Sequence, residues 1–155
     1  MHTKAQHSEN YYTLTIEMNN GREIRLPDQG KDIGMIEKLK RQYERMRIAQ
    51  LARRYCDSEQ YEKALELYSK MVNLEPENAV AYCNRAYIFS QLGQDEKAIE
   101  DYSRAIELDP NDADFFCGRG RVYNKLGKPM KAIEDYEKAI QINPELSTQW
   151  ELGVR

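Results

Sequence analysis

The sequence lacks the residue combinations on which most enzyme active sites depend. Its only histidines are His2 and His7, near the start of the chain, so no structured Ser-His-Asp or Cys-His arrangement is expected. No glycine-rich phosphate loop occurs, and none of the three cysteines lies in a Cys-x-x-Cys pair of the kind that holds zinc. We therefore expect no enzyme, no cofactor and no metal site.

Long apolar runs and a strong net charge are also missing. No stretch of about 18 apolar residues is present that could span a bilayer, and the first residues contain no apolar segment of signal-peptide type. The net charge is only −3, which gives no global attraction to nucleic acid or to an anionic membrane. We expect a cytoplasmic protein with neither nucleic acid nor membrane as a partner.

The chain does contain a repeat of fixed length. Pro76, Pro110 and Pro144 are 34 residues apart. A period of this length indicates stacked copies of one helical unit, and we place the copies at residues 45–78, 79–112 and 113–146. The same interval relates three more sets: Ala64, Ala98 and Ala132; Tyr68, Tyr102 and Tyr136; and Tyr55, Phe89 and Tyr123.

Each copy is predicted to be two helices joined by a turn. In the second copy the first helix covers Ala81–Leu92, Gly93 ends it, and the second helix covers Glu96–Leu108. Pro110 then breaks the chain, because proline cannot continue a helix. The first copy has Glu59 where the other two have glycine. The many carboxylates of the second helices, Asp101 and Asp135 among them, are predicted to form solvated faces.

The copies resemble the tetratricopeptide repeat. In the second copy the resemblance is carried by Tyr82, Ala86, Phe89, Gly93, Ala98, Tyr102, Ala105 and Pro110. In the third it is carried by Phe116, Gly120, Tyr123, Gly127, Ala132, Tyr136, Ala139 and Pro144. The first copy matches at fewer places and has Met71 where the others have alanine. The resemblance implies a mainly α fold, an α-α superhelix of helix-turn-helix units, and binding of a protein or peptide.

The residues before the repeats follow another pattern. Residues 1–10 are polar and are predicted to be a disordered tail. Residues 11–27 alternate in two runs around an Asn-Gly pair, which predicts a β-hairpin. A three-residue loop at residues 19–21 puts Ile24 opposite Ile16 and Leu26 opposite Leu14, with all four on one face, and we favour that register.

A helix is predicted to join the hairpin to the repeats. Residues 32–44 can form it, and no breaker occurs before Cys56, so the helix is expected to continue into the first copy. Its apolar stripe is typical of cover for the end of a solenoid, and a pairing face for a second copy of the chain is the alternative. The stripe consists of Ile36, Leu39, Tyr43 and Met46.

The end of the chain begins what looks like a fourth first helix. Residues 147–155 place Trp150 where the second and third copies have Tyr82 and Phe116, and we predict a partial C-terminal cap there. Cys83 and Cys117 are also one period apart. Equivalent helices in stacked repeats lie about 8–10 Å or more from each other, which is too far for a disulfide, so free thiols are expected.

In the fold that the resemblance implies, the first helix of each copy lines a concave groove. The inward positions mix arginine, lysine, amide and aromatic groups, which suit an extended peptide and its carboxylates. A solvated groove without a ligand is the alternative. The predicted peptide contacts are Arg53, Asn84, Tyr87, Arg121, Asn124 and Lys125.

One subgroup of the family clamps the acidic C-terminal tails of heat-shock chaperones with five polar residues. Of the five matching places in this chain only Asn84 agrees with that pattern, and Asp114 has the opposite charge. We therefore expect no clamp of that kind. The five places hold Ala49, Arg53, Asn84, Asp114 and Gly118.

The function expected from these observations is a non-catalytic protein–protein interaction module whose partner protein or peptide is unknown. A first alternative is a self-assembling structural module that pairs through the hairpin and the long helix, as a homodimer, or that associates end to end. A second alternative is a secretion-type chaperone, which the length and the repeat count resemble.

Overall fold

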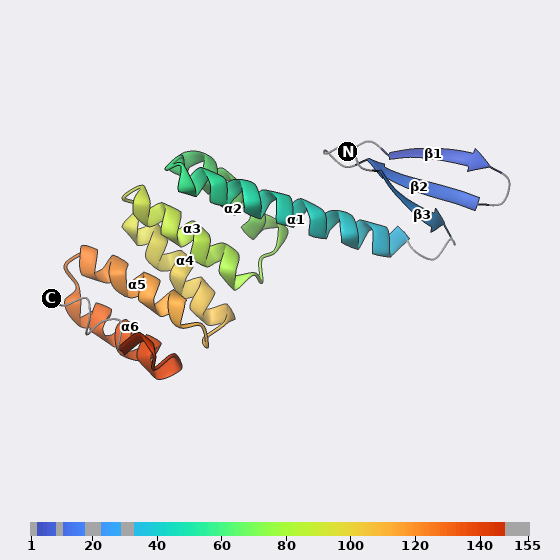
Figure 1. Ribbon diagram of the computed structural model, residues 1–155. Helices are drawn as coiled ribbons and strands as arrows, with labels where there is room; N and C mark the ends of the chain where they lie inside the picture. Colours follow the sequence, from blue (N-terminus) through green and yellow to red (C-terminus); the bar gives the residue numbers. More distant parts are fainter. Residues whose placement is uncertain (1–2, 9–10, 18–22, 29–32, 148–155) are drawn as a thin grey trace. The chain divides into compact units, whose positions relative to one another are not determined.

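The computed structural model describes residues 3–8, 11–17, 23–28 and 33–147, and the molecule is mainly helical (Figure 1). Three strands come first, and the helices α1 to α6 follow. The chain divides into two units, residues 1–44 and 45–155. Helix α1, Ile33–Asp57, contributes residues to both.

The first unit contains a three-stranded antiparallel sheet in the order β1-β2-β3. The strands are β1 (Thr3–Ser8), β2 (Tyr11–Glu17) and β3 (Glu23–Asp28). In the pairing of β2 with β3, Leu14 lies opposite Leu26 and Ile16 opposite Ile24. The loop predicted at residues 19–21 lies outside the described residues.

Strand β1 corrects the prediction for the start of the chain. The polar composition of residues 1–10 predicts a disordered tail, whereas residues 3–8 pair with β2, from Thr3 opposite Ile16 to Ser8 opposite Tyr11. The physical reason is that ladder hydrogen bonds satisfy backbone groups whatever the side chains are. Amino-acid composition describes side chains only, so it does not indicate that residues 3–8 can pair with the second edge of β2.

Helix α1 runs for 25 residues without interruption. Two members of the predicted apolar stripe are exposed, Leu39 by 45% and Met46 by 52%. Cover for the end of the array stays a prediction for this stripe. The predicted C-terminal cap also stays a prediction, because residues 148–155 lie outside the described part of the chain.

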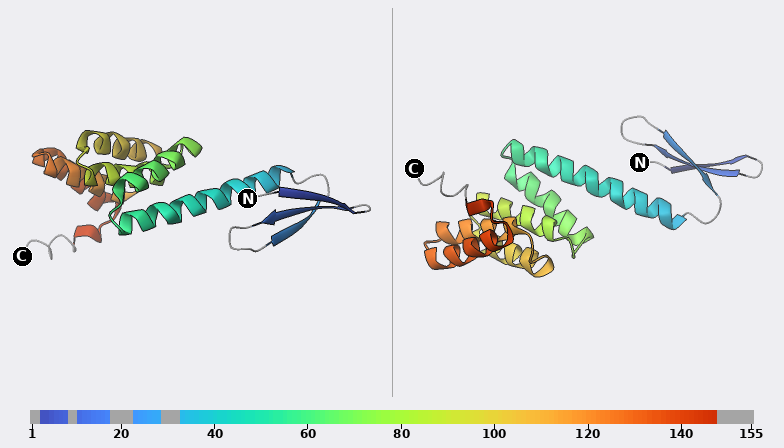
Figure 2. Two further views of the ribbon diagram at one scale, coloured as in Figure 1. Left: turned by 90° about the horizontal axis from the view of Figure 1, so that it is seen from above. Right: turned by 60° about the horizontal axis from the view of Figure 1, so that its bottom comes forward.

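The second unit is a series of helix pairs (Figures 1 and 2). After α1 come α2 (Tyr61–Leu74), α3 (Ala79–Gln91), α4 (Asp95–Leu108), α5 (Ala113–Lys125) and α6 (Pro129–Ile142). The starts of α3 and α5 are capped by residues at equivalent positions, 34 apart. The Asn78 side chain accepts a hydrogen bond from the Ala81 N–H, and the Asp112 side chain accepts one from the Asp114 N–H.

The turn inside each pair has one backbone conformation in all three copies. Gly93 and Gly127 have φ of 71° and 68°, and Glu59 takes the same left-handed region with φ of 56°. The backbone hydrogen bonds also repeat: the N–H of the next residue bonds to the carbonyl of Tyr55, Phe89 or Tyr123. The array therefore imposes this turn on copy 1 although copy 1 has no glycine there.

The core lies between copies as well as within them. Ala81 and Ile88 of α3 are fully buried in a cluster with Ile48 and Ala52 of α1 and with residues of α2. Val122 of α5 joins a cluster with residues of α3 and α4. Helices α3 and α5, the first helices of copies 2 and 3, therefore cover the apolar surface of the copy that precedes them, as stacking requires.

Two carboxylates of the second helices are not solvated, which corrects the sequence prediction. Asp101 and Asp135 are only 7% and 5% exposed. Each forms a two-pronged ion pair, Asp101 with Arg85 and Asp135 with Arg119. The pattern argument failed because it counted every aspartate as solvent-facing, whereas a buried carboxylate is stable when a guanidinium satisfies it.

Candidate peptide-binding groove

Three of the predicted contacts occupy equivalent places on successive first helices. Arg53 lies on α1, Tyr87 on α3 and Arg121 on α5, each 34 residues after the last. All three side chains are exposed, Tyr87 by 44%. Helix α3 contacts α5 directly, and Tyr102 of α4 lies within electrostatic range of both Tyr87 and Arg121.

Three tyrosines of the second helices, of which Tyr68 and Tyr102 are buried and Tyr136 is half-buried, lie close to this column of residues. Tyr68 of α2 is within electrostatic range of Arg53, and Tyr136 of α6 is within range of Arg121. Tyr102 of α4 is also within electrostatic range of Arg121. Burial raises the pKa of Tyr68, Tyr102 and Tyr136, with the arginines acting in the opposite direction. The phenols therefore stay protonated at neutral pH and can donate hydrogen bonds.

The contact between α4 and α5 depends on a glycine. A Cβ added at Gly118 would lie 2.4 Å from Cε1 of the Tyr102 ring. The ring, which is 4% exposed, thus packs directly on the α5 backbone. This close approach brings copies 2 and 3 together beside Arg121.

The cysteines near the groove have raised pKa values. Burial raises the pKa of the Cys83 thiol to about 12, with the carboxylates of Asp112 and Asp114 acting in the same direction and Arg121 opposing them. Burial also raises the pKa of Cys117. Because the thiolate is the nucleophile, the raised pKa values keep both thiols in their less reactive, protonated form at neutral pH. Cys56, Cys83 and Cys117 are free, as predicted.

The remaining predicted contacts differ in their surroundings. Asn124 is exposed and Asn84 is partly buried. The Lys125 ammonium is engaged inside the protein: its Nζ lies 2.8 Å from Asp95 Oδ1 and donates to the Ser90 carbonyl at 2.9 Å. Both partners belong to copy 2, so Lys125 links two copies through its charge.

Sequence reasoning missed the most heavily bonded arginines. Arg85 Nε and Nη2 donate to Asp101 at 2.6 and 2.8 Å, and Arg119 repeats the arrangement with Asp135 at 2.9 and 2.7 Å. Arg119 also donates to Ser103 of the preceding copy. The signal was present, because both the arginine and the aspartate recur after 34 residues. These pairs join the two helices of a copy and are unavailable to a ligand.

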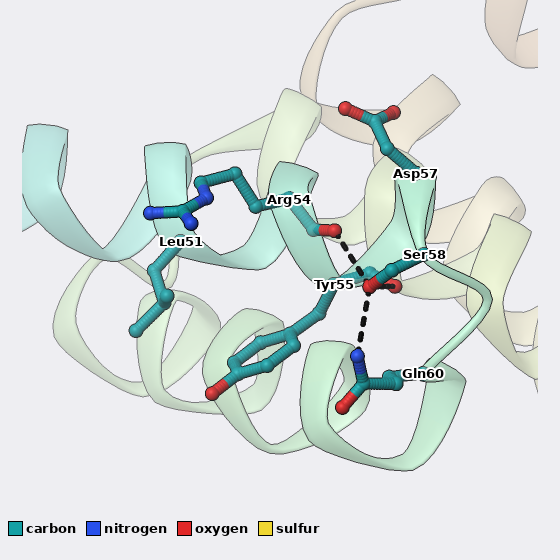
Figure 3. Close-up of a pocket in the computed structure, with 6 residues that line it drawn as sticks. All are labelled: Leu51, Arg54, Tyr55, Asp57, Ser58 and Gln60. Atoms are coloured by element: carbon teal, nitrogen blue, oxygen red, sulfur yellow. Dashed lines mark hydrogen bonds between the residues drawn. The ribbon is translucent and has the colours of Figure 1, made fainter.

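A shallow pocket of about 550 Å³ lies at the turn between α1 and α2 (Figure 3). It was not anticipated from the sequence. Ser58 Oγ donates to the Arg54 carbonyl, and Gln60 Nε2 donates to Ser58 Oγ, both at 2.9 Å. The lining residues are Leu51, Arg54, Tyr55, Asp57, Ser58 and Gln60.

No described residues form a group of three or more His, Cys, Asp or Glu side chains placed to hold a metal ion. Within the same described ranges, no helix has the length and hydropathy needed to cross a membrane.

Comparison with known families finds repeat models over most of the second unit. A model described as TPR repeat matches residues 52–93 and 86–127, and the Tetratricopeptide repeat model matches residues 113–146. No curated protein matches the chain.

Solved structures of similar fold include several repeat domains. The first TPR of Spaghetti (RPAP3), bound to the HSP90 peptide SRMEEVD, is 25% identical with a TM-score of 0.62, over 64% of this chain and 79% of that one. The Sgt2 TPR domain from Aspergillus fumigatus is 29% identical with a TM-score of 0.63, over 65% and 67%. MamA is 34% identical with a TM-score of 0.60, over 63% of this chain and 57% of its own length.

Proposed function

The chain belongs to the tetratricopeptide repeat family, and on that premise we propose that it is a non-catalytic module that holds a partner protein or peptide along its first helices. The observation that carries the proposal is the exposed column Arg53, Tyr87 and Arg121, repeated at the period of the array. The peptide-bound Spaghetti structure supports the general mode of binding.

The partner contacts follow from the chemistry of the column. No described residue forms an ion pair with Arg53 or Arg121, so both can bind carboxylates in a two-pronged manner. The exposed ring of Tyr87 offers a flat apolar surface between them. Asn84 and Asn124 can exchange hydrogen bonds with a peptide backbone. Lys125 contributes less, because Asp95 already holds its ammonium.

The ligand is proposed to differ from the acidic peptide seen on the Spaghetti repeats. At the five places of the chaperone-tail clamp this chain has Asp114, which would repel a terminal carboxylate, and Ala49 and Gly118, which have no polar side chain. The space next to the Gly118 backbone, where a side chain would project, is filled by the Tyr102 ring. An internal segment with acidic and apolar residues suits this surface better than a free C-terminus.

The experiment is selection of a peptide-display library on the full chain, followed by calorimetric titration of the selected peptides. Exchange of both Arg53 and Arg121 for alanine should weaken binding by at least about tenfold, since anchors of this type contribute more than about 1 kcal/mol each. Lys138→Ala on α6 is the matched control. Peptides that bind the double variant as tightly as the parent would refute the groove assignment.

Self-assembly is the second candidate, and one observation favours it. Met130 and Ile133 of α6 are 69% and 47% exposed, whereas Leu65 and Ile99, the counterparts of Ile133, pack within the array. Exposed apolar side chains on the last described helix favour contact with another copy of the chain. Light scattering over a concentration series decides this point, because a constant monomer mass excludes it.

A further inference from the structure

The first helix of copy 1 departs from the other two at the positions that face a preceding copy. In copies 2 and 3 these three positions are apolar. The residues 34 and 68 places earlier in copy 1 are polar. Arg47 corresponds to Ala81 and Phe115. Arg54 corresponds to Ile88 and Val122, and Ser58 corresponds to Leu92 and Leu126.

In copies 2 and 3 this surface receives a helix. Ala81 and Ile88, both 0% exposed, pack in one cluster with residues of α1 and α2. Val122, 2% exposed, packs with Tyr102 of α4. The shape of a first helix at these positions is thus suited to a helix lying across it. A further apolar repeat does not fit on copy 1, because it would bury Arg47 and Arg54 without partners.

The same surface of copy 1 combines apolar and cationic groups. Leu51 and Tyr55 are partly buried and line the shallow pocket. Arg47 and Arg54 are exposed, and neither has an ion-pair partner among the described residues. Asp57 is the only carboxylate in the pocket lining, and its side chain points away from Leu51 and Tyr55 in Figure 3.

We propose that this surface, which we call the α1 face and define as Arg47, Leu51, Arg54, Tyr55 and Ser58, binds an acidic amphipathic helix of a partner protein. An apolar side chain of that helix enters the pocket against Leu51 and Tyr55. Its carboxylates meet Arg47 and Arg54, which are seven residues apart and therefore separated along α1 by about 10 Å. Carboxylates at positions i and i+7 of the partner helix match this separation.

The α1 face is distinct from the groove. Arg53, which belongs to the groove column, is the neighbour of Arg54 and is turned from it by about 100° around the helix. A ligand of the α1 face therefore leaves Arg53 and Arg121 accessible, and the two sites can be tested separately on one protein.

The probe is a helix-stabilised peptide with two glutamates seven residues apart and leucines on the same face, titrated by fluorescence anisotropy into the full chain. Exchange of Arg47 and Arg54 for glutamate should weaken binding at least about tenfold at low salt. The peptide with lysine in place of both glutamates should regain affinity for that variant. Lys138→Glu, an exposed residue of α6 that belongs to neither surface, is the control and should bind the original peptide as the parent does. Circular dichroism and the melting temperature establish that the variants fold.

Three outcomes overturn the proposal. The first is no saturable binding of the acidic peptide, and the second is equal loss in the Lys138→Glu control, which would indicate general charge attraction. The third is binding of phosphatidylserine vesicles, abolished by the Arg47 and Arg54 exchange, without binding of the peptide, which would assign the surface to anionic lipid. If the groove variants keep full affinity in the peptide-display experiment, this result is unaffected, because the two tests exchange different arginines and use separately chosen peptides.

Discussion

The Tyr102 ring of α4 occupies the space into which a side chain at Gly118 of α5 would project. A Cβ built at Gly118 lies 2.4 Å from Cε1 and 2.5 Å from Cζ of that ring. Tyr102 is 4% exposed, so the ring has no solvent to move into. The approach of copy 2 to copy 3, and with it the surface beside Arg121, depends on the missing side chain.

Gly118→Ala should therefore destabilise the protein although alanine is the better helix former. Overpacking costs about 1–3 kcal/mol, and the gain in helix propensity returns at most about 1 kcal/mol. Denaturant unfolding at neutral pH measures the net loss. Gly34→Ala in α1, where a Cβ would meet nothing within 4 Å, is the control and should show no loss. Equal behaviour of the two variants would contradict the packing argument.

The ion pair between Arg85 and Asp101 can be tested with a substitution that the chain already contains. Copy 1 has Leu51 and Leu67 at the equivalent positions. Arg85→Leu alone leaves a nearly buried carboxylate without its guanidinium and should lower the free energy of unfolding by about 2–4 kcal/mol. The double variant with Asp101→Leu restores a matched pair and should lose much less. A double variant as unstable as the single one would mean that the ion pair itself is required.

The turn of copy 1 predicts a stabilising substitution. Glu59 has φ of 56°, in the region where its counterparts are Gly93 and Gly127. Glu59→Gly should raise the free energy of unfolding by up to about 1 kcal/mol, because relief of the left-handed conformation outweighs the greater freedom of glycine in the unfolded chain. A Cβ at Gly93 would meet no atom within 4 Å. Gly93→Ala should therefore lower the free energy of unfolding, through the cost of the left-handed backbone conformation alone. Thermal unfolding of both variants checks that Glu59→Gly stabilises the protein and that Gly93→Ala destabilises it.

Much of the second unit could be predicted from the period alone. For copy 2 the sequence predicts a first helix at Ala81–Leu92, and the helix covers Ala79–Gln91. It predicts a second helix at Glu96–Leu108, and that helix covers Asp95–Leu108. Proline and glycine mark the ends of these helices through backbone geometry, which is local and therefore readable from sequence. The left-handed turn at Glu59 shows the other case, in which the array fixes a conformation that the residue itself disfavours.

The side-chain partners were harder to predict, for a physical reason. Whether Asp101 faces water or Arg85 depends on the rotation of α4 against α3, and hydrophobic periodicity defines that rotation only roughly. Lys125 was predicted to contact a peptide, and its ammonium is held by Asp95 because the turn of copy 2 comes within reach of α5. The cation–π contacts of Lys63, Lys97 and Lys131 with the aromatic residue of each copy escaped notice, although both partners recur at the period.

Cys83 makes the stability of the folded protein fall as the pH rises above 9. Burial raises its pKa from 9.0 to about 12 in the folded protein. Above pH 9 the unfolded chain loses the thiol proton while the folded chain keeps it, so rising pH favours unfolding. The contribution of Cys83 is therefore fully present below pH 9 and is lost as the pH rises through about 12, at about 1.4 kcal/mol per unit.

Cys83→Ala isolates this contribution from other groups that titrate in the same range, Tyr68 and Tyr102 among them. Alanine is tolerated at the position, since copy 1 has Ala49 there. The stability advantage of the parent over Cys83→Ala should shrink by about 2 kcal/mol between pH 8 and about pH 10.5, measured by urea unfolding with a reductant present. Alkylation by iodoacetamide should be slow in the folded parent at pH 8 and rapid once urea unfolds it, because only the thiolate reacts. A pH-independent difference between the two proteins, or rapid alkylation of folded Cys83, would show that the thiol is solvated.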